Sequence, residues 1–506
     1  MAGPSVSGEQ VGVNVPLLPR GDQHEDGWED EIEVEAKLVK TLKERMRPFG
    51  ILYLLARVIQ NTIPIAALFG FREALALSPM QFSTVVAAYI IGKIPAILVS
   101  EVFGRQLERW PTIGPAAAVA LGFITILTGF TTNFAQIFLV RCASGFLAST
   151  MIMCNNRTHQ TWHKPKGGLP QPALYSIPLI VIIGLVEAAA VLYQPFVGQG
   201  PAQWKFMFYL LGIQMLAVAL YAWYRAPGCP DTATWPSYSE RQLVSKWKSE
   251  RDQRAQRRQP IEPHPAEGDD NAVRWYSPIL PYVKILYIAV CQMFFWTAKS
   301  VEWFWPLIFV GYLDIENPGP QTLLQCSAPW ILPGCIMMLY RWYWGKLMHK
   351  PAGLFFILMD LTGRLCFLVA VVGWGLVVWA HRGLQSLPLF MVTLVYVGDI
   401  PYDQAFRIGI SGILKSAIPW KQASAIRFLG FCCIAGEILG CYGWNARGDS
   451  FGQGLANIYL SSVASGLGVF SLCSKELAYA LKRPGERRES QGQESDMEMV
   501  QGSSNV

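Results

Sequence analysis

Long apolar windows separated by short polar segments dominate the sequence. Each window is about 20 residues long or longer, the length that an α-helix needs to cross a hydrocarbon core of about 30 Å. The chain has 506 residues, of which 52% are hydrophobic and only 15% are charged, a balance that indicates lipid as the solvent. The sequence therefore predicts an all-α integral membrane protein with twelve transmembrane helices. The windows cover residues 48–70, 80–100, 111–131, 134–155, 173–195, 204–225, 282–310, 320–341, 353–380, 387–413, 423–445 and 453–473.

One polar segment divides the windows into two groups of six. Residues 227–279 are rich in proline and in charges of both signs, a composition typical of a loop. We therefore expect an N-terminal six-helix half over 47–226, this central loop, and a C-terminal six-helix half over 280–476. The polar ends of the chain, 1–46 and 477–506, are expected to be disordered tails.

A charged run within the central loop has a helical pattern. Residues 238–258 carry the apolar side chains Leu243, Val244 and Trp247 among many charged ones. Two interpretations stay open. The run is either an amphipathic helix on the inner membrane leaflet or a solvated linker helix.

The distribution of basic residues predicts the orientation of the helices. Lysine and arginine are retained on the cytoplasmic side of a membrane, and here they gather before the first window, in the central loop and after the last window. Both termini are therefore expected in the cytosol, with the plasma membrane as the default location. The acidic N-terminal segment 25–31 is unlike a cleavable signal peptide.

Several short motifs occur in an order and spacing that resemble one branch of the major facilitator superfamily, the anion:cation symporters, which include fungal and bacterial allantoate, nicotinate, pantothenate and biotin permeases. Ser78–Phe82 resembles "LTxxQF", and Arg141 with Gly145 keeps "RxxxG". Three further segments are similar to "LTGFVTNF", "GWRWIF" and "PDSPETAKWL": they are 128–134, 203–208 and 230–235.

The resemblance implies a major facilitator fold of two six-helix halves and a secondary active transporter that alternates access around a midplane site. The substrate would be a small organic anion or vitamin-like carboxylate, moved with protons, by a monomer in a lipid bilayer without a cofactor or a metal. Arg105 and Gly145 would have structural or gating roles. Three positions depart from the family pattern: Ile59 and Gln60 replace an Asp-Arg pair, and Ala148 replaces an acidic residue. Both carboxylates that the resemblance implies for proton coupling in the N-terminal half are therefore missing.

Charges inside the windows mark candidate substrate-binding residues, because each costs at least about 2.5–3.5 kcal/mol at mid-bilayer unless it is paired or wetted. Arg57 lies one helical turn before Gln60 and either reaches the substrate or snorkels to the inner interface. Arg141 either binds substrate or braces the span ends. Arg427 adds positive charge, and Trp296 either lines an apolar pocket or belongs to an interfacial aromatic belt.

Four carboxylates are candidates for proton coupling in place of the missing ones. Glu187 has no oppositely charged neighbour in sequence, and Asp399 and Asp403 lie four residues apart near Pro401. An ion pair between Asp403 and Arg407 that only stabilises the fold is the alternative. Glu437 stands between two glycines that allow another helix to approach closely, so it either accepts a proton or pairs with an arginine from another span.

Other functional classes remain as alternatives. Export of a fungal secondary metabolite fits the same architecture, and so does a sensor on a transporter scaffold that does not transport. A membrane enzyme has only the pair His159 and His163 in its favour, at metal-ligand spacing, while the other histidines are isolated. The basic residues lie at span ends rather than in one patch, which argues against nucleic acid as a partner.

Overall fold

The structure, a computed structural model, describes residues 31–102, 112–162, 203–228, 230, 233–257, 280–300, 304 and 422–445. All regular secondary structure in these residues is α-helical. The helices are α1 (Glu31–Ala67), α2 (Phe71–Ala74), α3 (Pro79–Val102), α5 (Ile113–Thr128), α6 (Phe134–Thr161), α8 (Gln203–Arg225), α9 (Tyr238–Arg257), α10 (Leu280–Lys299) and α15 (Gln422–Asn445).

The helices match the apolar windows that fall in the described residues. Four are long and apolar enough to cross a membrane: Glu33–Ala67, Pro79–Val99, Phe134–His159 and Trp204–Arg225. Shorter apolar helices are Ile113–Thr128, Ile285–Phe294 and Phe428–Tyr442. The prediction of an all-α membrane protein is therefore confirmed. The other predicted spans and the segment 446–506 lie outside the described residues.

Helix α1 is longer than the first apolar window. It begins at Glu31, so residues 31–46 are helical where the sequence led us to expect a disordered tail. Val34, Leu38 and Leu42 recur every four residues and are 7%, 0% and 0% exposed, which shows that this stretch has one buried helical face. The charged residues between them concealed this apolar stripe in the sequence.

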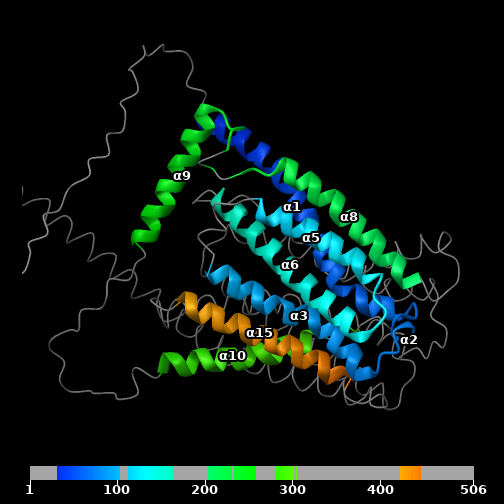
Figure 1. Ribbon diagram of the computed structural model, residues 1–506. Helices are drawn as coiled ribbons and strands as arrows, with labels where there is room; N and C mark the ends of the chain where they lie inside the picture. The colour runs from blue at the N-terminus through cyan, green and yellow to red at the C-terminus, as the bar shows by residue number, and fades with distance from the viewer. Residues whose placement is uncertain are drawn as a thin grey trace, which may run out of the picture.

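Helix α9 covers that face. Leu243, Val244 and Trp247 of α9 are buried in one cluster with the first turns of α1 and with Trp162 at the end of α6. The predicted helix in the central loop is therefore present. Its apolar face contacts protein, so neither a position on the inner leaflet nor a fully solvated linker describes it. Figure 1 shows α9 meeting the first turns of α1 at one end of the bundle.

Two hydrogen bonds set the start of α9. The Ser237 backbone N–H donates to Glu240 Oε2 at 2.7 Å, and the Glu240 N–H donates to Ser237 Oγ at 3.4 Å. This is a capping box, which satisfies backbone donors that have no partner in the first turn of a helix.

The same device explains the motif at the start of α3. The Ser78 N–H donates to Gln81 Oε1 at 3.0 Å and the Gln81 N–H donates to Ser78 Oγ at 3.3 Å, with Pro79 in the first helical position. At the start of α6, the Gln136 N–H donates to Asn133 Oδ1 at 3.0 Å. These motif residues end loops and begin helices.

Neighbouring helices pack in a continuous order. Helix α5 contacts α6 and α8, α1 contacts α8, and α6 contacts α3. From the other predicted half, α10 packs on α15, and α15 packs on α3. Figure 1 shows this series from α8 through α5, α6 and α3 to α15 and α10. The α3–α15 contact therefore joins the two predicted halves.

Glycines allow these helices to approach closely. A Cβ atom at Gly145 of α6 would overlap the Tyr89 carbonyl of α3, and one at Gly92 would overlap the Cys142 carbonyl of α6. Side chains at Gly436 and Gly440 would collide with α10. The predicted close approach of another helix to this glycine pair is therefore confirmed.

Candidate functional site

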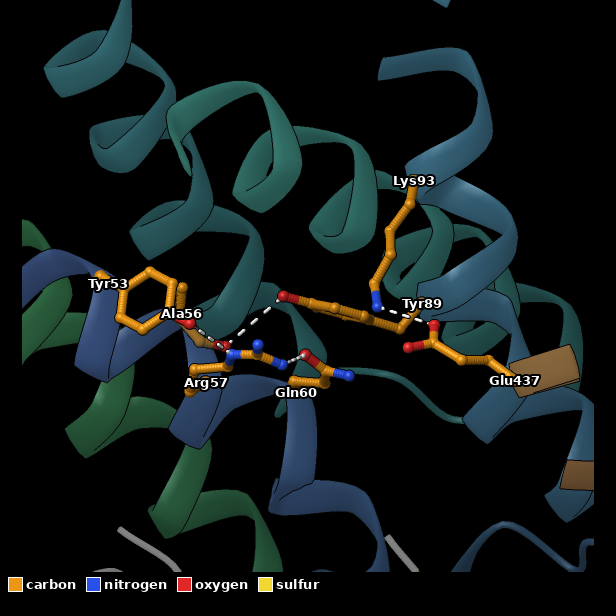
Figure 2. A network of polar contacts seen from close by, with 7 residues as sticks. All are labelled: Tyr53, Ala56, Arg57, Gln60, Tyr89, Lys93 and Glu437. Atoms are coloured by element: carbon orange, nitrogen blue, oxygen red, sulfur yellow. Dashed lines mark hydrogen bonds and ion pairs between the residues drawn. The ribbon is translucent and has the colours of Figure 1, made fainter. Parts of the chain in front are cut away.

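Charged and polar side chains meet near the middle of α1, α3, α6 and α15. Figure 2 shows those that come from α1, α3 and α15. We call this group the central polar cluster, and its members are Tyr53, Arg57, Gln60, Tyr89, Lys93, Arg141 and Glu437. Ionisable groups at membrane depth are functional candidates because burying them in an apolar medium is costly.

Arg57 is turned along α1 toward Gln60. Its Nε donates to the Tyr53 hydroxyl at 3.2 Å, and its Nη1 donates to Gln60 Oε1 at 3.4 Å (Figure 2). The guanidinium lies 5.5 Å from the centre of the Tyr53 ring. Of the two interpretations of Arg57, this geometry favours a charge held inside the bundle. Gln60 is 8% exposed, and its Nε2 has no hydrogen-bond partner among the described residues.

Arg141 of α6 braces α1. It is 1% exposed, and its Nη1 and Nη2 donate to the carbonyls of Ile59 and Gln60, both at 2.9 Å. Pro64 explains why a carbonyl is free there: proline has no N–H to bond the carbonyl four residues earlier, which is that of Gln60. These contacts tie Arg141 to the interior of α1 rather than to the span ends, and they favour a structural role for its guanidinium group.

Tyr89 lies between two cations. The Arg141 guanidinium is 4.9 Å from the centre of the Tyr89 ring, and Lys93 Nζ is 5.8 Å from it. The Tyr89 hydroxyl donates to the Ala56 carbonyl at 3.4 Å (Figure 2). Cations are attracted to the negative face of an aromatic ring, so Tyr89 helps to hold both side chains in place.

Lys93 and Glu437 form an ion pair across the two predicted halves. Lys93 Nζ lies 3.0 Å from Glu437 Oε2, and the side chains are 18% and 8% exposed. The sequence led us to expect a proton or an arginine as the partner of Glu437, and the structure has Lys93 instead. Sequence reasoning overlooked Lys93, although a lone lysine in the middle of the window 80–100 was a sufficient signal.

The charges of the central polar cluster do not balance within the described residues. Arg57, Lys93 and Arg141 are cations, while Glu437 is the carboxylate among the cluster members. Glu437 also interacts electrostatically with Arg57. Carboxylates are suitable partners for the guanidinium and ammonium groups of this cluster.

Helices α3 and α15 also touch near the C-terminal end of α15. The Tyr442 hydroxyl donates to Thr84 Oγ1 at 3.3 Å. Phe82 of α3 also packs edge to face on Phe304, which follows α10 in the chain, with ring centroids 6.4 Å apart. Thr84 and Phe82 begin α3, and Tyr442 is near the end of α15. By the predicted orientation, this is the outer end of the bundle, and α3 and α15 are closed there.

The structure brings together four of the predicted site residues, which are Arg57, Gln60, Arg141 and Glu437. Trp296 lies half-buried on α10, beside α15, and Gly145 lies in the α3–α6 contact. Arg427 belongs to α15, but its side chain is outside the described part of the structure. The remaining predicted residues lie outside the described residues: Arg105, Glu187, Asp399, Asp403 and Arg407.

The described residues contain no group of three or more His, Cys, Asp or Glu side chains that could hold a metal ion. His159 is in the last turn of α6, and its predicted companion His163 lies outside the described residues.

The fold is similar to that of solved transporters. The inward-open xylose transporter XylE from E. coli aligns with a TM-score of 0.56 at 14% identity, over 84% of this chain and 95% of XylE. The nucleoside transporter NupG aligns with a TM-score of 0.52 at 13% identity, over 87% and 99% of the two chains. The peptide transporter POT aligns with a TM-score of 0.54 at 11% identity, over 87% and 95%.

These similarities define the class of fold. A ligand-bound XylE structure is described as that of a major facilitator superfamily proton:xylose symporter. The chain therefore has the major facilitator fold, and its structural neighbours are transporters rather than enzymes. No protein-family model and no curated protein sequence matches the chain.

Proposed function

We propose that this protein is a secondary active transporter that carries a small organic anion, such as a vitamin-like carboxylate, by alternating access. The observation that carries the proposal is the central polar cluster, in which three cations and one carboxylate meet where the two predicted halves contact each other. The major facilitator fold supports transport, and the sequence motifs support placement in the anion:cation symporter branch.

The geometry suggests how transport proceeds. A substrate carboxylate competes with Glu437 for Lys93 and for Arg57, whose guanidinium is turned into the bundle. A proton that binds Glu437 removes its negative charge and breaks the ion pair, so that Lys93 becomes available to the substrate. Separation of α3 from α15 then opens the outer end. Glu187, Asp399 and Asp403 remain further candidates for the coupling proton.

Arg141 and Tyr89 have supporting roles in this mechanism. Two N–H groups of the Arg141 guanidinium donate to carbonyls of α1. Arg141 therefore positions the segment of α1 that carries Arg57 and Gln60, and it has fewer donors left for a substrate. We assign Arg105, Gly145 and Arg407 to structure or gating, and Trp296 and Arg427 to the C-terminal side of the binding site. The transporter functions as a monomer in the plasma membrane, with both termini in the cytosol and without a cofactor.

Counterflow in liposomes tests transport and substrate class together. Purified protein is reconstituted, loaded with a candidate solute, and assayed for exchange of labelled organic anions, neutral sugars and nucleosides. We expect exchange of an anion by the wild type and at least a tenfold loss in Arg57→Gln. The control variant is Lys205→Gln, which removes one positive charge in the first turn of α8, outside the central polar cluster.

The outcome separates the alternatives. Exchange of neutral solutes alone would contradict the anion assignment, and binding without any exchange would indicate a sensor. A fungal secondary metabolite exporter would give resistance to its substrate in cells that overproduce the protein, whereas an importer would give accumulation.

The coupling assignment is tested by Glu437→Gln, which should abolish the dependence of net uptake on a pH gradient while leaving exchange at equal pH.

A further inference from the structure

Two arginines lie where the apolar parts of α1 and α8 end, on the side of the membrane that the basic loops predict to be cytosolic. Arg45 lies three residues before the first apolar window, and Arg225 is the last residue of α8. Helices α1 and α8 pack together, and the two arginines are close enough for their like charges to act on each other. Because each marks the end of an apolar segment, both lie at the level of the membrane surface.

Aromatic rings hold both guanidinium groups. Arg45 lies 4.6 Å from the centre of the Trp235 ring, whose Nε1 donates to the Pro227 carbonyl at 2.7 Å. Arg225 lies 5.9 Å from the centre of the Tyr221 ring. A guanidinium that stacks its face on a ring keeps its N–H edge available for an oxygen acceptor.

No acid within the described residues neutralises this pair. Neither Arg45 nor Arg225 forms an ion pair with a described carboxylate, and Arg45 Nε is buried without a hydrogen-bond partner among the described residues. Like charges that act on each other repel, and an anion that contacts both guanidinium groups relieves this repulsion.

The adjacent surface of α8 is suited to lipid. Tyr221, Trp223 and Tyr224 are 50%, 47% and 83% exposed in the last two turns, and Leu220 is 60% exposed next to them. Aromatic side chains at the end of an exposed apolar helix face are typical of the membrane interface. A molecule that contacts the two arginines at this level therefore also meets apolar surface.

We propose that Arg45 and Arg225 bind the negatively charged head group of an anionic phospholipid from the cytoplasmic leaflet. The paired guanidinium groups supply charge-assisted hydrogen bonds to head-group oxygens, and the acyl chains lie along the exposed face of α8. Trp235 belongs to the connection between α8 and α9, so the bound lipid also contacts the segment that precedes α9. This site is separate from the central polar cluster.

Lipid titration of the purified full-length protein tests the proposal. Native mass spectrometry in detergent measures binding of phosphatidylserine and of zwitterionic phosphatidylcholine. We expect the wild type to prefer phosphatidylserine at least tenfold. The double variant Arg45→Gln/Arg225→Gln should lose that preference by roughly 10- to 30-fold, from about 1 kcal/mol for each basic group near an anionic surface.

Two control variants test whether the preference depends on these two arginines. Lys205→Gln, a charge loss at the other end of α8, should keep the preference, and Arg45→Lys/Arg225→Lys should keep part of it because the charge remains. Equal binding of both lipids by the wild type, or an unchanged preference in the double Gln variant, would overturn the proposal. Displacement of phosphatidylserine by millimolar inorganic phosphate would also overturn it, since the site would then bind a free anion.

Discussion

Pro64 and Arg141 should be energetically coupled. Pro64 leaves the Gln60 carbonyl without a backbone donor, and Arg141 Nη2 bonds that carbonyl at 2.9 Å. Arg141→Met keeps an unbranched side chain of similar length but leaves the Gln60 carbonyl buried and unpaired, which costs about 1–3 kcal/mol. The substitution also removes the hydrogen bond to the Ile59 carbonyl. We expect the free energy of unfolding to fall by about 3 kcal/mol.

The test is a double-mutant cycle. Pro64→Ala restores the N–H that bonds the Gln60 carbonyl, so Arg141→Met should cost about 1–2 kcal/mol less in the Pro64→Ala background than in the wild type. Denaturant titration of the four proteins in mixed micelles measures the difference. If the two substitutions are additive within about 0.3–0.5 kcal/mol, Arg141 does not replace the missing backbone donor, and our explanation of its position fails.

Three further substitutions test local packing. Gly145→Ala places a methyl group against the Tyr89 carbonyl and should lower the thermal stability clearly. Gly430→Ala has no atom within 4 Å of its Cβ and should not lower the free energy of unfolding, because alanine favours a helix over glycine by about 1 kcal/mol. Similar losses in the two variants would refute the close α3–α6 contact. Ser78→Ala should cost about 1 kcal/mol through loss of the α3 cap, and an unchanged denaturant midpoint would argue against the cap. Trp247→Ala should release α9 and speed proteolysis of the central loop, so an equal cleavage rate would show that α9 is not held there.

The membrane helices were predictable because their signal is long. A run of about 20 apolar residues has few stable alternatives to a spanning helix. Each window in the described residues contains an apolar helix, and four of these helices are long enough to span a membrane. The first turns of α1 were not predictable in the same way, since Val34, Leu38 and Leu42 are separated by charged residues. Their apolar stripe is buried by α9 and by Trp162, which lie far from it in the sequence.

The candidate site was predictable in part. Buried charges were recognisable one at a time from their positions inside apolar windows, and Arg57, Arg141 and Glu437 do meet. Which charge pairs with which depends on how α3 crosses α15, and sequence spacing carries no information on that. The pairing of Glu437 with Lys93 therefore required the structure, as did the link between Pro64 and Arg141.

The separation of α3 from α15 during transport is the central claim, and cross-linked flux tests it most directly. Thr84→Cys and Tyr442→Cys are introduced into a variant without reactive native cysteines. These two positions are chosen because the Tyr442 hydroxyl oxygen lies 3.3 Å from Thr84 Oγ1. A short, cleavable thiol cross-linker then joins the helices in liposomes that exchange a labelled organic anion. We expect the cross-link to stop exchange and its cleavage to restore it. Undiminished exchange with the cross-link intact would contradict the account.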